Sequence, residues 1–212
     1  ERPPSSPLYP CTAVFRSTLV EATRTKLIDA ARRAFAEKGY SAASMDDLTA
    51  EAGLTRGALY HNYGSKRGLL QAVIDQINAG ILVQMRAAGQ QFESKWHAFL
   101  AEAITYIEMS LEPEVQRIML LDGPAVLGDP SQWPNQTACL RTTADMLDNL
   151  IAEGTVKPMD TEAAAHLVNG AALNAALWIA ASREPVAALP RAVDAFRVLM
   201  SGLLVNPSVA AH

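Results

Sequence analysis

The sequence predicts an all-α protein of about nine helices. Helix-forming residues dominate, and apolar residues recur at helical spacing with no sustained alternation of period two. Glycines, prolines and N-capping residues divide the chain into segments of helical length. The length of 212 residues, 50% of them hydrophobic, suffices for one or two domains with a buried core.

The first helix is expected at 19–38. Leu27, Ala31 and Phe35 place one apolar stripe along it, and a glycine directly follows its end. Residues 1–17 hold four prolines and three serines, a composition typical of an irregular tail. We therefore expect the folded part of the chain to begin near residue 18.

Two short helices are expected next, at 45–52 and 55–61. Ser44 and Thr55 are residue types that cap helix N-termini by accepting a backbone hydrogen bond. Gly53 lies between the two segments and allows a tight turn. Two short helices joined by a glycine-containing turn are the signature of a helix-turn-helix unit.

The rest of the chain predicts further helices separated by proline and glycine. Ser65 precedes a long amphipathic segment at 66–88. Residues 122–124 interrupt a later segment, where a proline removes a helical hydrogen bond and predicts a kink. The other expected helices are 94–111, 113–127, 133–153, 161–181 and 187–204.

Charge is distributed unevenly along the chain, whose net charge is −4. From Arg16 to Arg67, nine basic and six acidic side chains leave a net of +3, whereas Gly68 to His212 carries eight basic and fifteen acidic, a net of −7. This asymmetry suggests two tasks in one chain, and chance variation between solvated faces is the alternative. With 2 cysteines, a disulfide framework and a cysteine-rich zinc module are excluded.

One segment is long enough to cross a membrane. Residues 163–182 contain no Asp, Glu, Lys or Arg. The segment nevertheless includes His166, Asn169 and Asn174, and much of the remainder is weakly hydrophobic alanine. We expect a buried helix at a subunit interface, no membrane partner and a cytoplasmic location.

The stretch from Ser44 to Lys66 carries residue types that suit a DNA-reading unit. In a helix-turn-helix, the first helix braces against the DNA backbone and the second places its N-terminal residues in the major groove. Arg56 has the donors for a bidentate pair with guanine, and Ala58 fits a thymine methyl group. The alternative is an ordinary helical hairpin whose glycines only end helices.

A longer sequence match favours the DNA-reading unit over the ordinary helical hairpin. The segment AGLTRGALYHNYGSK at 52–66, with FAEKGY before it at 35–40, resembles the recognition segment of the tetracycline-repressor (TetR) family of one-component regulators. The matching region covers residues 23–70. The resemblance implies a helix-turn-helix DNA-binding domain at 18–66 and an effector-binding and dimerisation domain at 67–212.

The resemblance also implies which residues contact DNA. Asp46 and Asp47 open the second helix, where acids repel phosphates, so we expect this helix to add little affinity beyond Ser44 and Thr49. The expected base contacts are Thr55, Arg56, Gly57 and Ala58. The expected backbone contacts are Ser44, Thr49, Tyr60, His61 and Lys66.

Two chains are needed to read a near-palindromic operator, because one domain with a net charge of +3 makes few phosphate contacts. The resemblance implies a homodimer formed through helices 161–181 and 187–204. The last helix has an apolar side for which an intrachain role in the core is the alternative. That side comprises Val193, Phe196, Leu199, Met200 and Leu203.

Aromatic and methionine side chains in the C-terminal region suit a cavity for a small, mostly apolar effector. The expected contacts are Trp96, Tyr106, Met109, Asn174 and Trp178, each with core packing as its alternative role. The resemblance implies that effector binding shifts 113–127 against the helix that begins at Lys66. The kink near Pro124 is the expected place for that movement.

No catalytic, metal-binding or cofactor-binding constellation appears in the sequence. The 4 histidines are scattered, and neither a phosphate-binding glycine motif nor a nucleophile elbow occurs. We therefore expect no enzyme, no metal and no cofactor, but a ligand-responsive repressor with double-stranded DNA as its partner. The alternative class is a helical small-molecule carrier or enzyme that keeps the same fold without an operator.

Overall fold

The computed structural model describes residues 11–206, and the side chains of residues 21–206. These residues fold into α-helices with short 3-10 and π segments, and no β-strand forms among them. One isolated backbone bridge pairs Val156 with Leu204. The predicted all-α class is thereby confirmed. The chain divides into two compact units, an N-terminal unit up to Val73 and a C-terminal unit from Ile74.

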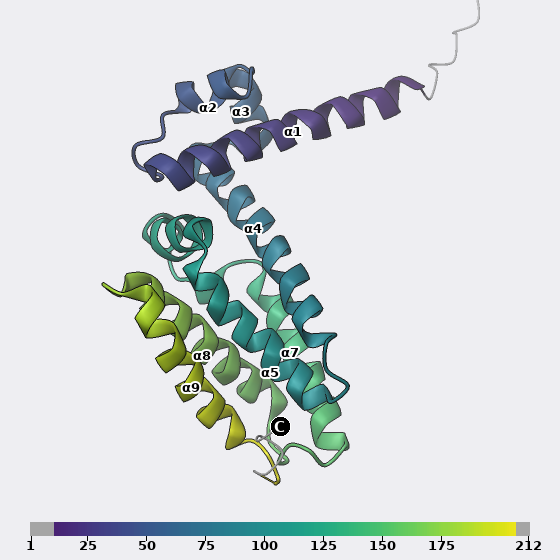
Figure 1. Ribbon diagram of the computed structural model, residues 1–212. Helices are drawn as coiled ribbons and strands as arrows, with labels where there is room; N and C mark the ends of the chain where they lie inside the picture. The colour runs from purple at the N-terminus through teal and green to yellow at the C-terminus, as the bar shows by residue number, and fades with distance from the viewer. Residues whose placement is uncertain (1–10, 207–212) are drawn as a thin grey trace, which may run out of the picture. The chain divides into compact units, whose positions relative to one another are not determined.

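The N-terminal unit contains three helices and the start of a fourth (Figure 1). They are α1 (Cys11–Lys38), α2 (Met45–Glu51), α3 (Arg56–Tyr63) and α4 (Lys66–Gly89). α1 is longer than expected, so residues 11–17 are helical rather than part of an irregular tail. No glycine or proline occurs between Pro10 and the end of α1, and nothing there interrupts a helix. Residues 1–10 lie outside the described residues.

A small apolar core joins the helices of the N-terminal unit. Phe35 of α1, Leu48 of α2 and Leu59 of α3 have no exposed surface. Leu69 of α4 is equally buried, whereas Leu54, in the turn, is half-buried. Burial of one face of α3 directs its opposite face to solvent.

Gly68 is required where α4 begins beside the end of α3. A Cβ atom at this position would lie 2.1 Å from the carbonyl oxygen of Tyr63, far inside van der Waals contact. The Tyr63 hydroxyl donates a hydrogen bond to the carbonyl oxygen of Arg24 in α1, at 3.0 Å. The hydrogen bond ties the end of α3 to α1, and the absence of a side chain at Gly68 lets the first turn of α4 approach the end of α3.

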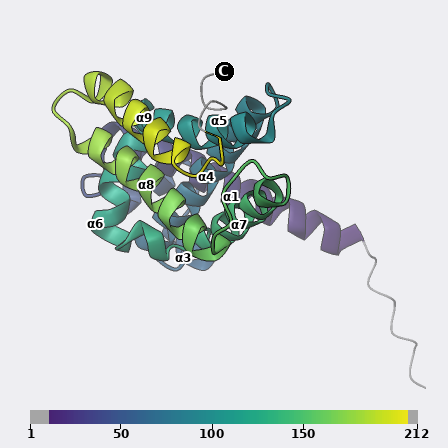
Figure 2. The ribbon, with the colours of Figure 1, turned by 90° about the horizontal axis from the view of Figure 1, so that it is seen from below.

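The C-terminal unit is built mainly of long helices that pack side by side (Figure 1, Figure 2). After α4 the α-helices of this unit are α5 (Lys95–Glu108), the short α6 (Gly123–Leu127), α7 (Gln136–Ala152), α8 (Thr161–Ala181) and α9 (Pro185–Ser201). α8 packs against α5, α7 and α9, and its bounds are those that the sequence predicts. The core between these helices includes Trp96, Ile107, Leu147 and Phe196.

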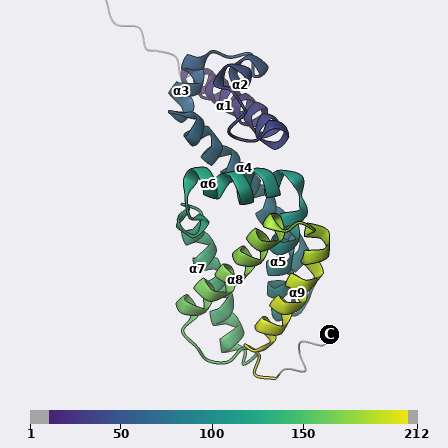
Figure 3. The ribbon, with the colours of Figure 1, turned by 90° about the vertical axis from the view of Figure 1, so that its left-hand side faces the viewer.

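The segment between α5 and α7 departs from regular α-helix. It contains a 3-10 turn at Met109–Leu111, a π-helix at Val115–Asp122, then α6, and a second 3-10 turn at Pro130–Gln132. The break from π-helix to α6 falls at the predicted interruption, because Pro124 lies in the first turn of α6. Figure 3 shows α6 lying across one end of the long helices of this unit.

Among the described helices, α8 is the one long and apolar enough to cross a membrane by length and composition. Its apolar window is 39% buried inside the protein, where Val168, Ala172 and Ile179 pack against neighbouring helices. Core helices of soluble proteins share this length and composition. One face of α8 therefore packs in the core of the C-terminal unit.

Candidate functional site

The turn between α2 and α3 is built by two N-caps and one glycine. The Ser44 hydroxyl accepts a hydrogen bond from the Asp47 N–H at 3.0 Å, and the Thr55 hydroxyl accepts one from the Ala58 N–H at 3.2 Å. Gly53 has a φ of +65°, which residues with a side chain rarely adopt. The two short helices are thereby held as a helix-turn-helix unit.

The first turn of α3 faces solvent. Thr55, Arg56 and Gly57 are exposed, as are Tyr60 and His61 one turn later. A Cβ atom added at Gly57 would meet only the Thr55 hydroxyl, at an ordinary contact distance of 3.7 Å. The fold does not need a glycine at position 57. Without a side chain there, another molecule has room to approach the α3 backbone closely.

Two of the expected DNA contacts are less accessible. Thr49 is 4% exposed, and its hydroxyl donates to the backbone carbonyls of Met45 and Asp46 at 3.0 and 3.1 Å. Ala58 is half-buried. Thr49 therefore packs the inner side of α2, which sequence reasoning missed because a helix of 7 residues has too little periodicity to assign its faces.

Acidic side chains of α2 pair with basic side chains on the neighbouring helices. Arg56 of α3 donates from both Nε and Nη2 to the carboxylate of Asp46. Glu51 accepts from Nε of Arg33 in α1 at 2.8 Å. The hydrogen bond from the Arg56 guanidinium holds the pKa of Asp46 below its usual value. The base-reading candidate is thus already paired within the chain.

Lys66 begins α4 beside the aromatic ring of Tyr40. Its Nζ lies 4.4 Å from the ring centroid and 3.5 Å from the carbonyl oxygen of Ser41, to which it donates. A cation over a ring face is attracted by the ring quadrupole. Lys66 is therefore held by groups of its own chain at the start of α4.

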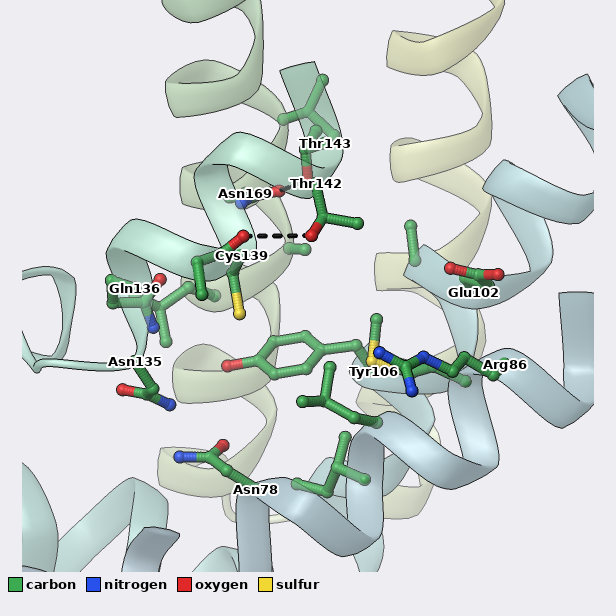
Figure 4. A pocket seen from close by; sticks show the side chains of 18 of the residues that line it. Asn78, Arg86, Glu102, Tyr106, Asn135, Gln136, Cys139, Thr142, Thr143 and Asn169 are labelled. Carbon is green, nitrogen blue, oxygen red and sulfur yellow. Dashed lines mark hydrogen bonds between the residues drawn. The ribbon is translucent and has the colours of Figure 1, made fainter. Parts of the chain in front are cut away.

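The C-terminal unit contains a cavity of about 390 Å³ between α4, α5, α7 and α8 (Figure 4). This volume lies in the range of sites for small organic ligands. Much of the wall is apolar. Its apolar lining includes Ile81, Met85, Phe99, Met146 and Leu173.

Tyr106 extends through the cavity between two groups of polar side chains (Figure 4). Burial raises the pKa of the Tyr106 phenol far above its usual value, so the hydroxyl stays neutral. Asn78 Nδ2 and Asn135 Oδ1, from residues near that hydroxyl, are buried without a hydrogen-bond partner. Arg86 and Glu102 lie on the other side. Burial raises the pKa of Glu102, and the charge of Arg86 partly offsets this effect.

Of the five expected effector contacts, Tyr106 lines this cavity and the other four do not. Trp96 is 1% exposed in the bundle core, and Met109 lies in the 3-10 turn after α5. Asn174 and Trp178 face outward on α8, where Trp178 is 47% exposed. Alanines lie on every side of α8, so its sequence shows no clear periodicity that assigns the inner face.

Sequence reasoning also missed most of the polar lining. Thr143 of α7 donates to Oδ1 of Asn169 in α8 at 3.0 Å, and burial raises the pKa of the Cys139 thiol in the same wall. On α4, Asn78 follows the inward-facing Ile77, and a polar residue beside an apolar stripe was an available signal. None of these polar residues, taken alone, marks a binding site in the sequence.

The outer faces of α8 and α9 expose large apolar side chains. Leu199 is 65% exposed, whereas Phe196 and Met200, expected on the same side of the last helix, are buried in the bundle. One stripe of α9 is therefore buried in the core, and the adjacent positions are exposed to solvent. The exposed apolar side chains of these helices are Leu167, Trp178, Val186, Val198 and Leu199.

The described residues contain no group of three or more His, Cys, Asp or Glu side chains that could hold a metal ion. The thiol of Cys139 is free and lies in the wall of the cavity. The two candidate sites are therefore the exposed turn of α3 and the cavity around Tyr106.

Comparison with known proteins identifies the family of each part of the chain. Residues 27–73 match a family model for bacterial regulatory proteins of the tetR family, and residues 96–203 match one for a tetracyclin repressor-like C-terminal domain. The fold and the exposed turn define a helix-turn-helix regulator with an appended helical domain. The chain belongs to the TetR family of bacterial transcriptional regulators.

Individual relatives support this assignment. The crystal structure of a TetR-family transcriptional regulator from Pectobacterium atrosepticum is 44% identical, with a TM-score of 0.82 over 90% of this chain and 98% of that chain. The regulator UidR of Escherichia coli K12 is 38% identical over 69 residues, 32% of this chain and 35% of that protein. The TetC protein of transposon Tn10 from Escherichia coli is 25% identical over 155 residues, 71% of this chain and 76% of that protein. The chain thus matches about a third of the length of UidR.

Proposed function

We propose that this chain is a sequence-specific transcriptional repressor that leaves its operator when a small, mostly apolar effector binds. The observation that carries the proposal is the first turn of α3, where Thr55, Arg56 and Gly57 are exposed on a capped helix-turn-helix unit. Membership of the TetR family supports it. Such a repressor acts on DNA in the cytoplasm.

The proposed contacts follow from this geometry. Arg56 supplies a bidentate pair to guanine in the major groove. Thr49 is left out of the proposed contacts because its buried hydroxyl is bonded within α2. The proposed base contacts are Thr55, Arg56, Gly57 and Ala58. The proposed backbone contacts are Ser44, Tyr60, His61 and Lys66.

Selection from a pool of random-sequence duplexes tests this proposal. The wild-type protein should enrich a near-palindromic site and bind it in the presence of competitor DNA. Arg56→Ala should weaken binding to that site by about 1–3 kcal/mol, with little effect on unrelated duplexes. If the protein enriches no duplex but binds small molecules, a helical carrier or enzyme on the same fold is favoured instead.

The operator proposal needs two chains, with recognition helices about 34–36 Å apart on successive turns of the duplex. We propose that a homodimer covers the exposed apolar faces of α8 and α9. Together these faces carry several large apolar side chains, whereas single exposed apolar residues are normal on a protein surface. Leu199→Glu should convert the dimer to a monomer in sedimentation velocity. Val83→Glu alters a similarly exposed position on α4, 66% exposed, and should leave the dimer intact. A monomeric wild-type protein contradicts the proposal.

The cavity around Tyr106 is the proposed effector site. Its apolar wall, neutral phenol and unpartnered amide groups of Asn78 and Asn135 suit an uncharged ligand with an apolar body and a hydrogen-bonding group. Because α4 contributes to the wall and also carries Leu69 in the N-terminal core, a ligand that moves α4 affects both units.

Release requires that the effector bind two arrangements of the protein with different affinity. We propose that Val115–Asp122 and α6 move against α4. A Cβ atom added at Gly123 would lie 2.8 Å from the Trp133 ring and 3.2 Å from Cδ1 of Ile74, so α6 packs directly on α4 and a shift of α6 displaces its contact with Ile74. Pro124→Ala should change effector-dependent release from the selected duplex, and unchanged release counts against this mechanism.

A further inference from the structure

The ion pair between Asp46 and Arg56 joins the first turn of α2 to the first turn of α3. The two carboxylate oxygens accept from Nε and Nη2, so Asp46 occupies the side edge of the guanidinium. We propose that Asp46 is a positioning residue that orients Arg56 to select a guanine, a role that rests on the proposed DNA-binding function.

The geometry leaves the reading edge of Arg56 available. A guanidinium has five N–H donors in a fixed fork, and Asp46 uses one from Nε and one from Nη2. The end edge, formed by Nη1 and the second N–H of Nη2, matches the O6 and N7 acceptors of guanine. Asp46 and a guanine therefore bind different edges of the same planar group.

Anchoring favours discrimination because an arginine side chain has many rotamers. A free Arg56 loses this freedom when it binds a base and adapts to other acceptors when guanine is absent. A side chain held by Asp46 has lost much of the freedom already and presents one edge in one direction. The anchored arginine therefore distinguishes guanine more sharply than a free one.

The same carboxylate lowers affinity for DNA in general. A negative charge in the first turn of α2 repels phosphates whatever the base sequence. The hydrogen bond from Arg56 lowers the pKa of Asp46, so this charge is retained when the pH falls moderately. Asp46 thus weakens non-specific binding while it orders the base-reading side chain, and both effects raise specificity.

Asp47 provides a matched control within the same helical turn. Its carboxylate is similarly exposed, but it pairs with Lys38 of α1 at 4.0 Å rather than with a base-reading residue. Asp46→Asn and Asp47→Asn each remove one charge near the DNA. Exposed ion pairs contribute little to stability, so both variants should fold like the wild type, which thermal unfolding checks.

The experiment compares duplexes selected by the wild-type protein with versions substituted at each base pair. The Arg56→Lys variant first identifies the base pair at which guanine is no longer preferred. At that base pair, Asp46→Asn should reduce the preference for guanine about tenfold. Its affinity for a random-sequence duplex should rise. Asp47→Asn should raise random-duplex affinity likewise and leave the guanine preference unchanged. In an Arg56→Lys background, Asp46→Asn should not alter the preference further.

Other outcomes overturn the inference in distinguishable ways. If Asp46→Asn binds the selected duplex more tightly with its guanine preference intact, Asp46 only competes with DNA for Arg56. If Asp47→Asn loses the preference equally, the effect belongs to charge or helix stability. If no selected base pair depends on Arg56, the inference and the proposed Arg56–guanine contact fail, while sequence-specific DNA binding by the protein stands. If the wild type enriches no duplex, the proposed function fails as well.

Discussion

The N-terminal and C-terminal units carry their candidate sites in opposite physical settings. The proposed DNA-reading residues Thr55 and Arg56 lie on the outside of short helices whose starts are fixed by side-chain caps. The cavity around Tyr106 lies inside the C-terminal unit, where four helices leave a space of about 390 Å³. The surface site therefore depends on local backbone geometry, and the cavity depends on which faces of distant helices meet.

The two settings also differ in the room they leave for an added side chain. The end of α3 is so close to α4 that a Cβ atom at Gly68 would overlap a backbone oxygen. The C-terminal cavity has space for a ligand. Added volume should therefore lower stability more at Gly68 than in the wall of the cavity.

The largest effect is expected from Gly68→Ala in the N-terminal unit. The new Cβ atom would lie 2.1 Å from the carbonyl oxygen of Tyr63, so the first turn of α4 must move away from α3. We expect the free energy of unfolding to fall by about 3 kcal/mol, measured by chemical denaturation with circular dichroism. Gly80→Ala is the control on the same helix, because nothing lies within 4 Å of its Cβ position. It should stabilise the protein by about 0.5–1 kcal/mol, and equal effects of the two substitutions contradict the argument from crowding.

A larger substitution should be tolerated in the C-terminal unit. Ala103→Trp places an indole in the cavity wall on α5 and should lower stability less than Gly68→Ala. Affinity for a neutral naphthylamine dye that fluoresces in apolar surroundings should fall about tenfold, measured by titration. Ala101→Trp lies on the same helix outside the lining and should retain the affinity. Equal dye binding by both variants places the dye outside the cavity.

Gly57→Ala separates folding from DNA binding in the N-terminal unit. The added methyl group makes an ordinary contact within the chain, so stability should change by less than about 1 kcal/mol. If the α3 backbone approaches DNA closely, affinity for the selected duplex should fall about tenfold, measured by fluorescence anisotropy. Unchanged affinity means that the first turn of α3 does not approach DNA as proposed.

The smallest effect is expected for Glu102 in the cavity wall. Burial raises its folded-state pKa, so the folded protein favours the protonated form more than the unfolded chain does. The contribution to stability is present below the unfolded-state pKa of about 4.3 and is lost as the pH rises through the folded-state pKa. Relative to Glu102→Gln, the wild type should lose a little stability over that range. Parallel pH profiles of unfolding contradict this expectation.

Much of the N-terminal unit could be predicted because its signals are local. Ser44, Gly53 and Thr55 each lie within a few residues of the helix end that they define. The start of α1 at Cys11 was missed, because an abundance of prolines in the preceding residues suggested a longer irregular tail. The burial of Thr49 was missed because a short helix does not reveal its inner face.

The sequence predicted that the C-terminal region holds a cavity, but not which residues line it. Tyr106 lines it, whereas Trp96 packs in the core and Trp178 faces outward, although all three are aromatic residues on apolar helices. Whether such a side chain lies in a core, a cavity or an outer face depends on neighbours far away in the sequence.

By itself, the sequence determined the order of the helices, the capped turn before α3 and the exposed residues at its start, because caps and glycines act on adjacent backbone. Tertiary structure alone decided which side chains enclose the cavity and that Asp46 binds the side edge of Arg56. These contacts join residues on separate helices, and their geometry exists only after the helices have packed.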